Sequence, residues 1–141
     1  MSKLELLNTF IKNYQDRTFE TGVNDCALFA SDWAKTLTGL DLATRFRGKY
    51  RSDLGSARLI KKLGYRGLED LVCSELDRIG HRLENPLQAE RGDIAWVQGP
   101  TEKVCGIVGG TGVFVLGLNG LVSLPVTKVL RAWSIDYLEV N

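Results

Sequence analysis

The residues best suited to chemistry in this sequence are the dipeptide Asp25-Cys26, which opens an apolar helical pattern. A thiol at a helix N-terminus can be a nucleophile, because unpaired amide groups and the helix dipole stabilise a thiolate there. The carboxylate of Asp25 opposes that effect, so the local sequence leaves the direction of the thiol pKa shift open. On helical spacing alone, a small core side chain is the more common use of such a cysteine.

The other thiols and the single imidazole follow no metal or disulfide pattern. The chain has 3 cysteines and 1 histidine. Cys26, Cys73, Cys105 and His81 are too far apart in sequence for the paired-ligand motifs of a zinc site. An odd number of distant cysteines is also typical of a reducing compartment. We therefore expect no metal and no cofactor, and we expect Cys73 to lie in the core.

Composition restricts the class of protein. The 141 residues, of which 44% are hydrophobic, carry a formal net charge of +1. They fit one domain, 1–141, without a field that would attract nucleic acid or an anionic membrane. The N-terminus lacks the uninterrupted apolar core of a secretory signal, and no run is apolar enough to span a bilayer. We expect a protein made in the cytoplasm, with no nucleic-acid partner and no membrane-spanning segment.

Hydrophobic periodicity changes near residue 90. Before it, apolar residues recur at helical intervals in four segments, 4–14, 24–37, 52–63 and 67–79. Asn24 is the expected N-cap of the second segment, and Gly39 is its expected stop. From residue 93, short β-branched and aromatic runs alternate with turn residues, as in an antiparallel meander. The sequence predicts an α+β domain, with a helical half at about 1–80 packed on a β half at about 91–135.

Three motifs in this order resemble the NlpC-type cysteine peptidases, a papain-like superfamily that cuts cell-wall peptides. They are Asn24-Asp25-Cys26, Arg91-Gly92-Asp93 and Gly106-Ile107. The resemblance runs from about Phe19 to Trp133, and it implies a papain-like, NlpC-type fold with Cys26 at the nucleophile position. Within the superfamily, the chain looks most like short proteins encoded in phage tail gene clusters, which are distantly similar to the tail-assembly protein K of lambda-like phages. Gly120-Leu121 and Arg131-Ala132-Trp133 carry this closer resemblance.

The peptidase pattern is broken at both polar partners of the thiol. Val104 stands two residues before Gly106, where the peptidases have the base histidine, and Leu116 stands at the position of the third, orienting residue. A cysteine nucleophile needs a base within hydrogen-bond reach and a group that orients the base. The resemblance thus implies a degenerate site in which Cys26 is vestigial. His81 is the remaining candidate base, but a lone histidine in a turn is more often a solvated surface residue.

The resemblance leads us to expect a structural or assembly component of a phage tail tip rather than an enzyme. Its partners would be other tail proteins, first in the host cytoplasm and then in the virion tail. The alternative is an active peptidoglycan peptidase or amidase with Cys26 as nucleophile and with Asp25 and His81 in its site. An unrelated small-molecule module rests on composition alone. The expected docking surfaces are the N-terminal helix and a basic loop formed by Arg45, Phe46, Arg47, Tyr50 and Arg51.

Overall fold

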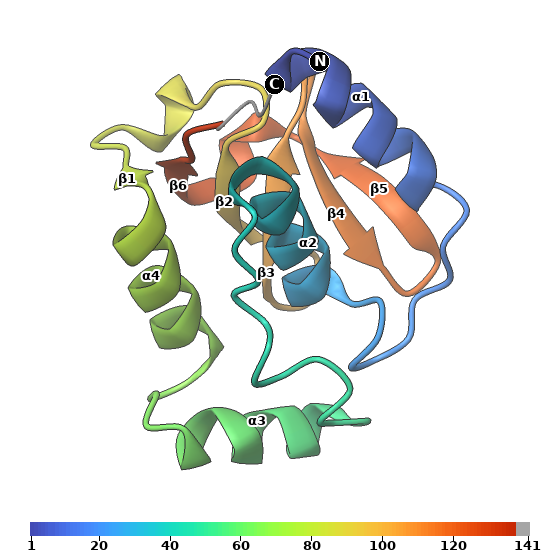
Figure 1. The fold of residues 1–141 in the computed structure, drawn as a ribbon, viewed down its shortest axis with the longest axis vertical. Helices are drawn as coiled ribbons and strands as arrows, with labels where there is room; N and C mark the ends of the chain where they lie inside the picture. The colour runs from blue at the N-terminus through green and yellow to red at the C-terminus, as the bar shows by residue number, and fades with distance from the viewer. Residues whose placement is uncertain (138–141) are drawn as a thin grey trace.

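The structure, a computed structural model, describes residues 1–137 and contains four α-helices followed by a six-stranded antiparallel sheet (Figure 1). The helices are α1 (Lys3–Tyr14), α2 (Cys26–Thr38), α3 (Asp53–Lys62) and α4 (Leu68–Ile79). The strands are β1 (His81–Arg82), β2 (Ile94–Gln98), β3 (Lys103–Val108), β4 (Val113–Gly117), β5 (Gly120–Leu124) and β6 (Val129–Ser134). This arrangement confirms the predicted α+β class.

Capping residues explain where the helices begin and end. The side chain of Ser52 accepts a hydrogen bond from the Gly55 amide at the start of α3, and Gly39 ends α2 in a left-handed conformation with φ 79°. The prediction of Asn24 as the cap of α2 was wrong by one residue. Asp25 is the N-cap, because its carboxylate accepts from the Leu28 amide.

The strands follow the order β1-β6-β2-β3-β4-β5, and every pair is antiparallel. Strand β1 lies between the two predicted halves of the chain. Its residues His81 and Arg82 pair with Ser134 and Trp133 of β6. Two residues are too short to show an alternating pattern, so only the pairing with a distant strand reveals β1.

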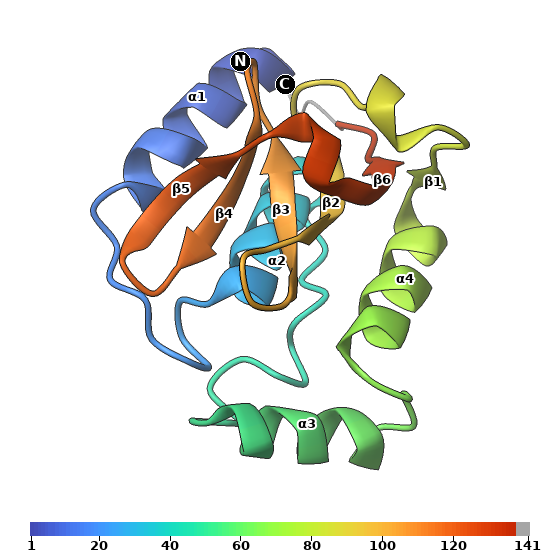
Figure 2. The same cartoon turned by 180° about the vertical axis from the view of Figure 1, so that it is seen from behind.

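Helix α2 lies across one face of the sheet, whereas α3 stands apart from it (Figures 1 and 2). The largest buried side chains include Trp33 and Phe29 of α2 and Trp133 of β6. The indole Nε1 of Trp33 donates to the Gly92 carbonyl at 2.8 Å, which holds the middle of α2 to the turn before β2. A buried donor left without a partner costs about 1–3 kcal/mol, so this bond fixes the register of helix on sheet. Among the described residues, no helix combines the length and apolar character needed to cross a bilayer.

Gly106 allows β3 and β4 to lie close together. A β-carbon on Gly106 would lie 2.7 Å from Val113 Cγ1 and 2.8 Å from the Phe114 carbonyl oxygen. We expect Gly106→Ala to lower the free energy of unfolding by about 1–3 kcal/mol, because backbone of β4 must move. Urea unfolding measures this. Gly117→Ala is the matched control, since a β-carbon there meets only the Gly120 carbonyl oxygen at 3.7 Å; equal losses in both variants would contradict the explanation.

Candidate functional site

Asp25 organises the loop that leads into α2. It is buried, and its Oδ1 accepts from the Leu28 amide at 3.0 Å. Its Oδ2 accepts from the Gly22 amide at 3.0 Å and from the Tyr50 hydroxyl. Gly22 has φ 86°, and a β-carbon on it would lie 2.0 Å from the Tyr50 carbonyl oxygen. The carboxylate therefore ties together the start of α2, a turn that only glycine fits, and the loop before α3.

Cys26 is the first residue of α2. Burial, and to a smaller extent the Asp25 carboxylate, raises the pKa of its thiol to about 11. The backbone amides of Cys105 and Ala27 act in the opposite direction but do not reverse the shift. At pH 7, roughly one thiol in ten thousand is then ionised. The sequence left the direction of the thiol pKa shift open. Desolvation decides it, because the dipole of α2 stabilises a thiolate by only about 0.3–1 kcal/mol.

The two aliphatic residues at the expected positions of the polar partners line the cleft onto which Cys26 opens. Val104 on β3 and Leu116 on β4 line the same cleft as Cys26. Leu116 is 2% exposed, and Val104 is half-buried. The structure thus brings these three sequence-predicted positions together. Leu116 belongs to the core that contains α2, and Val104 packs against the cluster of Ala95 and Val97. Neither aliphatic side chain can act as a base for the sulfur, and apolar surroundings disfavour a charged sulfur.

His81 lies on another part of the sheet. It is exposed on β1, and three strand spacings, about 14 Å, separate β1 from β3. It does not line the cleft of Cys26, and within residues 1–137 no hydrogen bond joins it to Cys26. A role as base would require β1 to leave its place beside β6. The same part of the chain contains no group of histidine, cysteine and acidic residues arranged to hold a metal ion.

The cleft beside Cys26, which we call the Cys26 cleft, has a volume of about 920 Å³. It separates the sheet from the α3–α4 arm, by which we mean α3, α4 and the loop before α3 that carries Phe46. Its walls are mostly apolar: Phe46, Ile60, Leu68, Leu71 and Val72 on the arm, and Val104, Val115, Leu116, Val122 and Leu124 on the sheet. Ser31 also lines it, and its hydroxyl oxygen is buried with no hydrogen-bond partner in the described residues. Such a size and lining suit a largely apolar ligand.

The predicted docking loop turns largely inward. Phe46 is 6% exposed and packs with Ile60 and Leu71, and Tyr50 donates to Asp25. Arg47 pairs with Asp32 at 2.8 Å and with Asp41 at 3.1 Å.

Of the five residues predicted to form the docking surface of this loop, Arg45 and Arg51 are the exposed ones. Arg45 donates to the Tyr65 hydroxyl and lies 3.9 Å from a Glu75 carboxylate oxygen, with about half of its side chain exposed. Arg51 is exposed. Local sequence could not reveal the inward contacts, because Asp25, Asp32 and Ile60 come from other parts of the chain.

Fold and site together define an α+β domain in which a half-buried cysteine, with no imidazole beside it among the described residues, opens onto a largely apolar cleft. A family model described as "Domain of unknown function (DUF6950)" matches residues 3–135, and the chain therefore belongs to this family. No curated protein sequence matches the chain.

The raised pKa predicts slow alkylation of Cys26. The thiolate is about a hundredfold scarcer than for an ordinary thiol, but a more basic sulfur is the stronger nucleophile, so we expect iodoacetamide to react roughly tenfold more slowly than with a free cysteine peptide. The rate should keep rising with pH beyond pH 9, since the thiolate fraction still grows there. Peptide mapping by mass spectrometry separates Cys26 from Cys73 and Cys105. A rate equal to that of the free peptide at pH 7 would mean that the thiol is activated.

The pairing of Arg47 with two carboxylates makes its replacement costly. Arg47→Ala should lower the free energy of unfolding by about 1–3 kcal/mol, because Asp32 and Asp41 lose a partly buried partner. Arg47 lowers the pKa of Asp41, so this contribution is present above pH 4 and is lost as the pH falls through the lower, folded-state pKa. The difference in free energy of unfolding between wild type and Arg47→Ala should therefore become smaller in acid. Arg51→Ala, at an exposed position, is the control and should change stability by less than about 0.5 kcal/mol; equal effects would exclude the ion-pair explanation.

Proposed function

We propose that this protein is a structural or assembly component of a phage tail tip, built on a papain-like, NlpC-type fold that no longer catalyses peptide cleavage. The observation that carries the loss of catalysis is the environment of Cys26. Its thiol has a raised pKa beside Asp25, and the aliphatic Val104 and Leu116 line the cleft with it. The tail assignment rests on the sequence resemblance to proteins of phage tail gene clusters.

The arrangement of α2 supports the NlpC-type interpretation. A cysteine is the first residue of α2, which packs on β3 and β4. β3 carries Gly106-Ile107, and the turn before β2 carries Arg91-Gly92-Asp93. The three motifs of the resemblance therefore surround a single helix and its sheet. Their order along the chain has a spatial counterpart, which a chance match of short motifs would not be expected to have.

Energetics favour binding over catalysis at this site. A positioned general base contributes roughly 10²–10⁴ in rate, and an imidazole next to the sulfur would also supply the charge that favours a thiolate. Cys26 has neither, and the Asp25 carboxylate acts against ionisation. The Cys26 cleft keeps its volume of about 920 Å³ and its apolar walls. A scaffold that retains a cleft but not the base is suited to contacts with other proteins.

The rival function is a peptidoglycan peptidase or amidase with Cys26 as nucleophile. The observation in its favour is that Cys26 lines a cleft large enough for a peptide. A base would then have to come from a partner protein, because His81 lies on the distant strand β1. A supply in trans is compatible with a protein that works inside an assembly. We regard the peptidase or amidase as the less favoured function, because it requires a base from a second protein.

Complementation of a phage with this gene deleted distinguishes the two functions. We expect the deletion to abolish complete tails, and Cys26→Ser to restore tails and plaque titre to wild-type levels, since the thiol does no chemistry. Antibody labelling should place the protein at the tail tip. Asp25→Ala is the control variant that should fail to restore tails, because the loop before α2 depends on that carboxylate.

Two outcomes would overturn this proposal. Normal tails from the deletion phage would exclude a role in assembly. Release of soluble peptides from purified peptidoglycan by wild-type protein, alone or with tail proteins, and its loss in Cys26→Ser, would establish the peptidase.

A further inference from the structure

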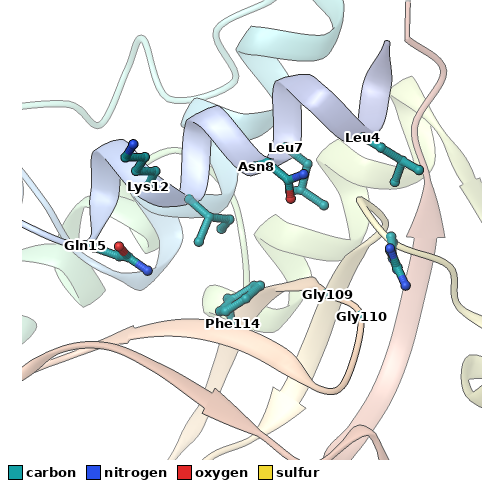
Figure 3. A pocket seen from close by; sticks show the side chains of 10 residues that line it. Leu4, Leu7, Asn8, Lys12, Gln15, Gly109, Gly110 and Phe114 are labelled. Atoms are coloured by element: carbon teal, nitrogen blue, oxygen red, sulfur yellow. The ribbon is translucent and has the colours of Figure 1, made fainter.

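A second hollow lies between α1 and the turn that joins β3 to β4 (Figure 3). We call it the α1 groove. Its volume is about 540 Å³. Its floor is apolar and consists of Leu4, Leu7, Ile11 and Phe114. Leu4 is 48% exposed, so an apolar side chain at one end of the floor faces solvent.

The rim of the α1 groove is polar and carries no negative charge. The residues that line it are Asn8 and Lys12 of α1, the C-cap residue Gln15, and Arg91 from the turn before β2, and no carboxylate lines it. Within residues 1–137 the side chains of these four residues form no hydrogen bond or ion pair. The neighbouring Glu90 forms no ion pair with Arg91 either. By contrast, Arg131 pairs with Glu69 and Arg82 pairs with Asp77.

The position of Arg91 is defined by its surroundings although its side chain is exposed. The Gly92 amide donates to the Val108 carbonyl at 2.8 Å, and Asp93 Oδ2 accepts from the Glu90 amide at 2.8 Å. The first bond holds the turn to the end of β3, and the second closes the turn on itself. A β-carbon on Gly110 would lie 3.3 Å from Arg91 Nε and 3.4 Å from its Cζ. The guanidinium group therefore lies against the glycine turn beside the apolar floor.

We propose that the α1 groove binds an acidic segment of a partner protein that also carries apolar side chains. Its carboxylates would pair with Arg91 and Lys12, and its apolar side chains would cover Leu4 and Phe114. The argument is charge complementarity. The rim offers cationic and amide donors, and no carboxylate lines it to balance the charge of Lys12 and Arg91. A guanidinium binds a carboxylate through two parallel hydrogen bonds. This inference rests on the proposed function and gives it a docking surface and a partner chemistry.

The lining favours a peptide over nucleic acid. A nucleic acid needs a track of cations along its phosphates and aromatic faces for its bases. The α1 groove offers two cations and a single ring, that of Phe114, among aliphatic side chains. Aliphatic floors with polar rims are typical of protein interfaces. The chain as a whole has a net charge of +1, so no general attraction for polyanions supplements the groove.

The expected affinity for a short peptide is low. An exposed ion pair contributes about 0.2–1 kcal/mol, so most of the binding energy must come from covering the floor. Reversal of both cations replaces two attractions by two repulsions. We expect a change in affinity of about tenfold, and we expect it to weaken as salt rises.

The test is an NMR titration of the purified chain with three synthetic peptides that share their leucine positions and carry Glu, Gln or Lys between them. We expect the Glu peptide to bind most tightly and to shift amides of α1 and of residues 109–114. The double variant Lys12→Glu, Arg91→Glu should bind the Glu peptide about tenfold more weakly and should prefer the Lys peptide. Lys128→Glu reverses an exposed cation outside the groove and should bind like wild type.

Several results would overturn the assignment of the α1 groove. They are equal affinity for the three peptides, no shifts at millimolar peptide, shifts that cluster elsewhere, or tighter binding of a single-stranded oligonucleotide at the groove. The titration uses isolated protein, so its failure would leave tail assembly through another surface intact. Conversely, absence of the protein from tails would overturn the proposed function without affecting a measured preference for the acidic peptide.

Discussion

The buried carboxylate of Asp25 is the interaction on which the site depends. A buried charge without a cation must be met by hydrogen bonds, and here the Leu28 amide, the Gly22 amide and the Tyr50 hydroxyl supply them. These donors come from α2, from the turn before it and from the loop before α3. The same charge raises the pKa of Cys26. One carboxylate therefore builds the start of α2 and disfavours a thiolate at its first residue.

The two hollows of the protein differ in the chemistry they offer. The Cys26 cleft has apolar walls on the α3–α4 arm and on the sheet. The α1 groove has an apolar floor but a rim with Lys12, Arg91 and two amides. Neither brings together a nucleophile, a base and an orienting group from the described residues.

The motif Arg91-Gly92-Asp93 shows how a sequence signature divides into separate physical roles. Gly92 has φ 92° and its carbonyl accepts from the Trp33 indole, so it joins the turn to α2. Asp93 is buried, and its carboxylate accepts from the Glu90 amide within the turn. The Arg91 guanidinium lies against Gly110, and its side chain forms no hydrogen bond or ion pair within residues 1–137. The glycine and the aspartate are structural, which leaves the arginine available for a partner.

The sequence alone determined the periodic elements, because the spacing of apolar residues that marks a helix or a strand is a pattern of residues near one another in the chain. It located the helix stop at Gly39, the four helical segments, and the part of the chain after residue 90 that forms β2 to β6. It also indicated the aliphatic residues at 104 and 116. Only the tertiary structure decided that β1 joins the sheet, that Asp25 rather than Asn24 caps α2, and that Phe46, Arg47 and Tyr50 turn inward. Those outcomes depend on partners distant in sequence, which packing selects and local pattern does not encode.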